Sequence, residues 1–70
     1  MIPFQAEVVI KHRNGNEEVV LTDLYDSIQM LWSNGFVGYS SQKSWRIYNI
    51  DAITYVEKRI ISYLTDNQGK

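Results

Sequence analysis

The stretch Trp45–Ile61, WRIYNIDAITYVEKRII, decides the fold. It is the longest run rich in β-branched and aromatic residues, which are the types that strands favour. Two interpretations are open: two strands broken by a tight corner at Asp51–Ala52, or one strand followed by a helix. A helix would carry an amphipathic stripe, made of Ile53, Val56, Ile60, Ile61 and Leu64. Residues 53–56 begin a helix poorly, because β-branched side chains lose rotamer freedom there. The sequence favours a strand through about Glu57, and leaves residues 58–64 as either more strand or helix.

The N-terminal part predicts a β-hairpin. Phe4–Lys11 alternates apolar and polar residues, which is the period of a half-buried strand. Asn14-Gly15 follows, and this pair tolerates the positive φ angles of a tight turn. Glu17–Thr22 is then the returning strand.

The segment Thr22–Gly35 is ambiguous. As a helix it would be capped at Thr22 or Asp23 and would end at Gly35. As β structure, Asn34-Gly35 would be a second hairpin turn between the apolar strands 27–32 and 36–39. We favour the hairpin, because the residues after Gly35 continue as a strand without a break. The polar residues 40–44 then form a loop.

These elements predict a single domain, residues 1–70, with a frayed polar tail at 65–70. Its class is mainly β: a small antiparallel five-stranded barrel or curled sheet. The alternative is an α+β domain in the order ββαββα, with helices near 23–34 and 51–64.

Strands in this order resemble a small Sm-like or SH3-like barrel over Ala6–Arg59. Tyr48–Val56 is similar to the end of the bacterial Sm-like RNA chaperone, in which a tyrosine-ended strand turns through a Lys-His-Ala-Ile segment into the last strand. The residues at 50–53, Ile-Asp-Ala-Ile, occupy that segment here. The hairpin VVIKHRNGNEEVV also looks like the opening of that family. The resemblance implies a barrel.

The departures concern function. The family's basic Lys-His pair contacts RNA, and Ile50-Asp51 stands in its place here. The family's N-terminal helix has no counterpart, since Pro3 and Phe4 lead into the first strand. One residue, Asn49 or Ile50, is also inserted. The resemblance therefore does not extend to the binding of uridine tracts.

Composition limits the classes of function. Hydrophobic residues make up 44% of the chain and argue against disorder, while a net charge of −1 gives no global attraction to nucleic acid. No segment approaches the length of a membrane span, and the N-terminus lacks the pattern of a signal peptide, so we expect a cytoplasmic protein. There is no cysteine, and the single histidine, His12, has no evident orienting partner. The acidic residues at 17, 18, 23 and 26 lack the spacing of a calcium loop and predict a solvated face. We therefore expect no enzyme, no cofactor and no metal site.

One stretch is a candidate binding site. No acidic residue lies between Ser27 and Ile50, where two cations stand among aromatic, hydroxyl and amide side chains. Such a set can stack a base, neutralise a phosphate and bind a ribose or base edge. The candidate residues are Tyr39, Ser41, Gln42, Lys43, Trp45, Arg46 and Tyr48. On a strand, Arg46 and Tyr48 share one face and Trp45 lies on the other. The competing interpretation places Trp45 and Tyr48 in the core or an interface, with ordinary solubilising cations.

The sequence predicts a small non-enzymatic binding module, a homo-oligomer that acts as a protein–protein modulator or inhibitor. This prediction rests on the lack of catalytic residues and on two Trp and five Tyr, because Trp, Tyr and Arg dominate interface hot spots. The alternative is a protein that binds or sequesters a nucleotide or short oligonucleotide. The expected partners are thus a second copy and another protein, or a nucleotide, and no membrane.

Overall fold

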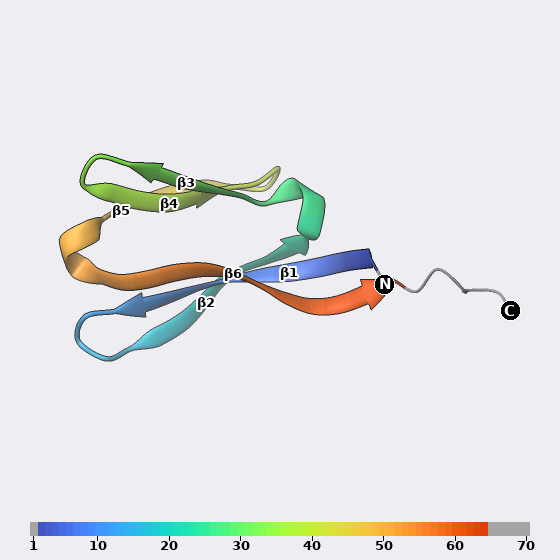
Figure 1. Ribbon diagram of the computed structural model, residues 1–70, viewed down its shortest axis with the longest axis horizontal. Helices are drawn as coiled ribbons and strands as arrows, with labels where there is room; N and C mark the ends of the chain where they lie inside the picture. The colour runs from blue at the N-terminus through green and yellow to red at the C-terminus, as the bar shows by residue number, and fades with distance from the viewer. Residues whose placement is uncertain (1, 65–70) are drawn as a thin grey trace, which may run out of the picture.

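The computed structural model describes residues 2–64, which form six strands and two short 3₁₀ turns (Figure 1). The strands are β1 (Ile2–His12), β2 (Glu17–Leu24), β3 (Gln29–Ser33), β4 (Phe36–Ser40), β5 (Trp45–Asn49) and β6 (Ile53–Leu64). The 3₁₀ turns are η1 (Tyr25–Ser27) and η2 (Ile50–Ala52). The mainly β class is confirmed. The predicted tail, 65–70, lies outside the described residues.

Both helices of the α+β alternative are wrong, since residues 2–64 contain no α-helix. Residues 23–34 hold the end of β2, the turn η1 and all of β3, so the second hairpin is the correct interpretation. Residues 53–64 are a single strand, which settles the segment that the sequence left open. The apolar residues of β6 happen to be spaced like the stripe of an amphipathic helix, although the segment is a strand.

The strands form two open three-stranded sheets rather than the expected five-stranded barrel. Sheet A has the order β2-β1-β6 and sheet B the order β3-β4-β5, and every pairing is antiparallel. The prediction was wrong in the number of strands and in their closure. A barrel needs strands that pair in both sheets. Here β2 and β3 are separate strands divided by η1, β5 and β6 are separate strands divided by η2, and no ladder joins the two sheets among residues 2–64.

The turns follow from local chemistry. Gly15 and Gly35 have φ values of 98° and 77°, which glycine adopts at little cost. In the first turn, the Gly15 N–H donates to the His12 carbonyl at 3.0 Å. At the second corner, the side-chain oxygen of Asn49 accepts the Asp51 N–H at 2.9 Å and caps η2. The corner at Asp51–Ala52 therefore bends the chain from one strand into the next, as the sequence predicted.

The core lies between the two sheets, and the central strands supply most of it. β1 and β4 contribute alternate residues, β6 contributes Ile53 and Val56, and Ile28 follows η1. The buried cluster is Ala6, Val8, Ile10, Ile28, Val37, Tyr39, Ile53 and Val56. The period of two in β1 thus identifies the core-facing side, because successive strand residues point to opposite faces.

Sheet A is much longer than sheet B. β1 has 11 residues and β6 has 12, whereas β4 has 5. The surplus length projects as a two-stranded arm beyond η1 (Figure 1). Phe4, which the alternation places on the core-facing side, is exposed there because no strand of sheet B lies opposite it.

Lys58, in β6, connects sheet A to the segment between β2 and β3. Its ammonium group donates to the Ile28 carbonyl oxygen at 3.0 Å and lies 4.0 Å from the centre of the Tyr25 ring. We expect Lys58→Met to lower the free energy of unfolding by about 1–2 kcal/mol, because a half-buried carbonyl and a cation–π contact are lost together. Urea unfolding followed by tryptophan fluorescence measures the change.

Arg59, the next residue, provides the control. Its ion pair with Glu57 is exposed at the surface, and its pair with the half-buried Glu7 is longer, at 3.8 Å. Arg59→Met should leave the urea midpoint almost unchanged, because exposed pairs contribute little. If both substitutions shifted the midpoint equally, Lys58 would not hold the segment between β2 and β3 against sheet A.

Candidate functional site

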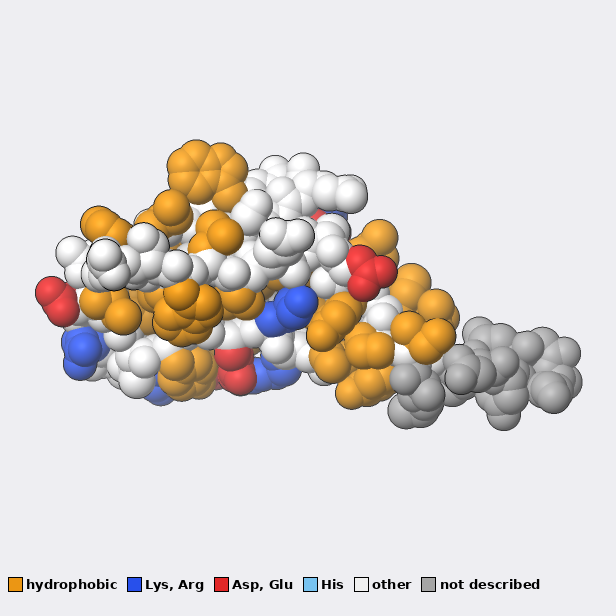
Figure 2. All heavy atoms as spheres, turned by 45° about the horizontal axis from the view of Figure 1, so that its top comes forward, with side chains coloured by type: hydrophobic (Ala, Val, Ile, Leu, Met, Phe, Trp, Pro, Cys, Tyr) orange, Lys and Arg blue, Asp and Glu red, His pale blue; other side chains and the backbone are white. Residues whose placement is uncertain are grey.

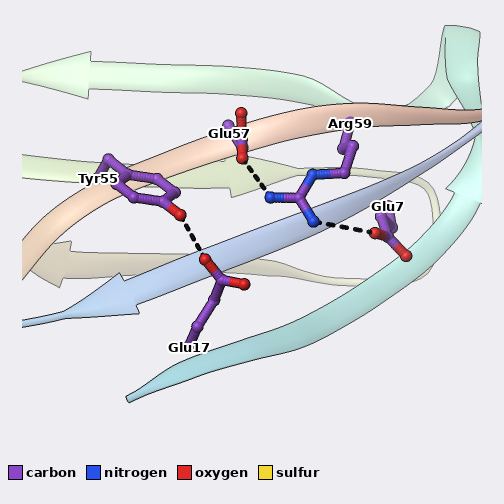
Figure 3. Close-up of polar contacts among 5 residues, drawn as sticks. All are labelled: Glu7, Glu17, Tyr55, Glu57 and Arg59. Carbon is purple, nitrogen blue, oxygen red and sulfur yellow. Dashed lines mark hydrogen bonds and ion pairs between the residues drawn. The ribbon is translucent and has the colours of Figure 1, made fainter. Parts of the chain in front are cut away.

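The outer face of sheet A is polar and its charges are paired (Figure 3). Arg59 donates to the Glu57 carboxylate at 2.6 Å and lies 3.8 Å from the Glu7 carboxylate. The Tyr55 hydroxyl donates to the Glu17 carboxylate. The hydrogen bond to Glu17 raises the pKa of Tyr55, and the hydrogen bond to Glu57 raises the pKa of Arg59. This face is mainly charged, and Val19 is an exposed apolar residue among the charged side chains.

The outer face of sheet B is apolar and carries no carboxylate. The register aligns Leu31, Gly38 and Ile47 in one row across the three strands. Phe36 lies in the next row on one side and Trp45 in the next row on the other. We call these five residues the apolar face. Its members lie opposite to the side of β4 that bears Val37 and Tyr39, so they point away from the core.

A hollow of about 270 Å³ lies on the apolar face. Its lining residues are Leu31, Trp32, Ser33, Phe36, Val37, Gly38 and Ile47. Gly38 forms its floor, and the bulkier side chains around it form its walls. The volume suits one or two apolar side chains, because pockets for drug-sized ligands begin at about 300 Å³.

Apolar side chains reach the surface over sheet B and again at the end of the arm (Figure 2). The second group lines a shallow hollow together with Asp26, Ser27 and Gln42. Its apolar members are Ile2, Pro3, Phe4, Leu24 and Leu64. Sheet B differs from the arm in that its strands and its loop 41–44 contain no acidic residue.

The strand residues predicted as a binding site do not gather on one surface. Trp45 is 68% exposed and lies on the apolar face. Arg46 and Tyr48 lie on the other side of β5, so the predicted division between the two faces is confirmed. Tyr39 lies opposite Arg46 but is only 3% exposed, and it belongs to the core. Its ring therefore offers no free surface for stacking a ligand.

The predicted loop residues also separate. Ser41 uses its hydroxyl to close the turn, accepting the N–H groups of Lys43 at 3.2 Å and Ser44 at 3.3 Å. Gln42 lines the hollow at the arm. Lys43 is exposed at the tip of the loop. Among the predicted residues, Trp45 is therefore exposed on the apolar face, and Lys43 is exposed in the loop that precedes it.

The sequence did not single out Leu31, Phe36, Gly38 or Ile47. Two signals could have identified them. A glycine inside a strand marks a close approach of backbone, and Gly38 is the central residue of β4. The turn at Asn34-Gly35 also fixes the register of β3 against β4, which places Leu31 beside Gly38.

The histidine and the acidic residues show different arrangements. His12 has a partner in space, because its Nε2 lies 2.7 Å from the Glu18 carboxylate. No group of three metal-ligating side chains occurs among the described residues. The expectation of a solvated face is wrong for Asp23, which is only 8% exposed. One carboxylate oxygen of Asp23 accepts the Leu24 N–H at 2.9 Å, and the other has no partner among residues 2–64.

Tyr48 gives a pH-dependent prediction. Burial raises its pKa above the ordinary value of 10.0, and the nearby Arg46 guanidinium opposes this effect only in part. Above pH 10 the unfolded state loses the Tyr48 proton first, so the free energy of unfolding should fall as the pH rises from about 10. Urea unfolding at several alkaline pH values measures the fall. Tyr48→Phe should make it shallower, and an unchanged slope would contradict this account.

No helix among the described residues is long and apolar enough to cross a membrane, and the cellular compartment stays a prediction. No protein-family model matches the chain, no curated protein matches its sequence, and no solved structure matches its fold, so the likeness to Sm-like barrels also stays a prediction.

Proposed function

We propose that this chain is a non-enzymatic, homo-oligomeric module that binds another protein through the apolar face and acts as a modulator or inhibitor by occupying its partner. The observation that carries the proposal is the contrast between the two outer faces. Sheet A presents mainly paired charges. Sheet B presents Phe36 and Ile47 to solvent beside a hollow, and Trp45 is exposed in the next row of the same face. Exposed apolar patches of this kind, bordered by polar residues, mark interaction sites.

The chemistry of the face defines its partner. The hollow accepts an apolar or aromatic anchor side chain. The apolar face has no carboxylate, and Lys43 is an exposed cation in the loop that precedes Trp45, so acidic groups beside that anchor would be attracted and basic groups would be repelled. The preferred ligand is therefore a protein segment with an apolar or aromatic anchor flanked by Asp or Glu.

Selection from a library of short random peptides tests this proposal. We expect enrichment of peptides with an apolar or aromatic anchor and acidic neighbours. Their binding should be lost in Ile47→Asp, which places a carboxylate beside the hollow. The matched control is Val19→Asp, an exposed valine of β2 on sheet A. Peptides that bound both variants equally well, or a selection without enrichment, would contradict the proposal.

A second function, nucleotide or short-oligonucleotide binding, is favoured by one observation. Trp45 is highly exposed in a region without carboxylates and is next to the loop that carries Lys43. An exposed indole beside a cation can stack a base while the cation contacts a phosphate. Nucleotides should then quench tryptophan fluorescence at low salt. The quenching should vanish in Trp45→Phe and persist in Trp32→Phe; no quenching in the unmodified chain would exclude this function.

A further inference from the structure

The structure assigns a second copy of this chain to the free edge of β3, where two β3 strands would pair antiparallel about a two-fold axis. This inference specifies the interface of the proposed homo-oligomer. It does not depend on peptide binding to the apolar face. It rests on the unpaired edge of β3, on the lack of charge in that strand and on the symmetry of its sequence.

Each sheet leaves two strands with one unpaired edge. These four strands are β2 and β6 in sheet A, and β3 and β5 in sheet B. An edge strand exposes backbone N–H and C=O groups that can pair with another chain, and proteins usually protect such edges with charges, proline or bulges. A comparison of the four edges therefore shows where pairing is least opposed.

Three of the four edge strands are protected. β2 begins with Glu17 and Glu18 and has an irregularity in its register opposite Val8 and Val9. β6 carries Glu57, Lys58 and Arg59 at its centre and shifts register against β1 at three places. β5 carries Arg46. Self-pairing of β2 would bring carboxylates together, and self-pairing of β5 would place the charged Arg46 in the pairing surface.

β3 has none of these protections. Its sequence, QMLWS, contains no charge and no proline, and its register against β4 is regular over all five residues. Trp32 is 65% exposed although it shares a row with the core residue Val37. Figure 1 shows β3 at the margin of the molecule, on the side away from sheet A.

The sequence of β3 is compatible with pairing to itself. With the two-fold axis at Leu31, that residue opposes its own copy, and Met30 opposes Trp32 of the second chain. Gln29 opposes Ser33 of the second chain. The pairs are apolar with apolar and polar with polar, without like charges. A thioether beside an indole is a favourable contact. The product is a continuous six-stranded sheet in which the apolar faces of both copies lie on the same side.

A five-residue strand pairing buries less area than a standard interface, so the dimer should be weak, with a Kd of about 1–100 μM. Light scattering after size exclusion should show the mass of two chains of 8.2 kDa at high concentration and of one chain on dilution. A chain that remained monomeric up to about 1 mM would overturn the inference.

Two substitutions test the position of the interface. Trp32→Lys places solvated ammonium groups in the pairing surface and should weaken the dimer by about tenfold or more. Val19→Lys, at an exposed site on the edge strand β2, should leave the dimer unchanged. Circular dichroism verifies that both variants are folded. A dimer that resisted Trp32→Lys would overturn the assignment to β3.

A cross-link tests the register. Opposed residues of antiparallel strands have Cα atoms about 4.5–5.5 Å apart, within the range of a disulfide. Because the natural chain has no cysteine, Leu31→Cys should form a covalent dimer on mild oxidation and Val19→Cys should not. Failure of the first variant to cross-link would overturn the two-fold axis at Leu31. None of these results decides whether the apolar face binds peptides, which the Ile47→Asp variant tests separately.

Discussion

Gly38→Ala should largely unfold the protein. A Cβ atom at Gly38 would lie 2.0 Å from the Arg46 carbonyl oxygen and 2.8 Å from the Ile47 Cα. Both atoms belong to the backbone of β5, so neither can rotate away, and the strands must separate instead. We expect a loss of about 3–5 kcal/mol in the free energy of unfolding, at the upper end of single-substitution effects. The total for a chain of this length is about 4–10 kcal/mol.

Urea unfolding with circular dichroism measures this loss, and Gly35→Ala is the matched control. A Cβ at Gly35 meets nothing within 4 Å, but the φ of 77° is strained for any side chain. The cost there should be only about 1–2 kcal/mol, the penalty of a left-handed conformation. If Gly38→Ala were as stable as Gly35→Ala, β4 and β5 would not approach each other as described.

Tyr39→Ala should cost about 3–5 kcal/mol, as for other large aromatic side chains removed from a core. Tyr39 is 3% exposed and packs in the cluster between the two sheets. The substitution leaves a cavity that the short strand β4 cannot close by shifting, since both of its edges are paired. Thermal and urea unfolding should both show a strongly destabilised or unfolded chain.

Trp45→Ala is the control for Tyr39→Ala, because it removes an aromatic side chain from the surface and not from the core. Tyr39 and Trp45 both belong to the predicted binding set, yet Trp45 is exposed on the apolar face. Its removal should change the free energy of unfolding by no more than about 0.5 kcal/mol. It should still abolish the proposed fluorescence response to ligands. Equal destabilisation by the two substitutions would show that Trp45 is also part of the packing.

The hairpins were predictable because local chemistry specifies them. The alternation in Phe4–Lys11 predicts a strand, and the pairs Asn14-Gly15 and Asn34-Gly35 predict turns. Each of these signals depends only on residues that are neighbours in the sequence. The corner at Asp51–Ala52 was predictable for the same reason, since β-branched residues follow it directly. Residues 58–64 were not, because their spacing fits a helical stripe and a strand, and only pairing with β1 selects the strand.

The candidate site was less predictable. Trp45 and Lys43 were identified because a stretch without acidic residues can be recognised directly in the sequence. Gly38 and Ile47 were missed, since nothing in their immediate sequence shows that they share a row with Leu31. That row depends on the register of three strands, and a shift of one residue would turn each side chain to the opposite face.

The sequence by itself determined a mainly β domain, the places of its turns and the absence of negative charge from residues 27–50. These properties depend on residue types and on contacts within a few positions. The tertiary structure decided that the sheets stay open, that Tyr39 is buried while Trp45 is exposed, and that β3 has a free uncharged edge. These depend on which strands pair and on which face the second sheet covers, and both are set by packing between residues far apart in the chain.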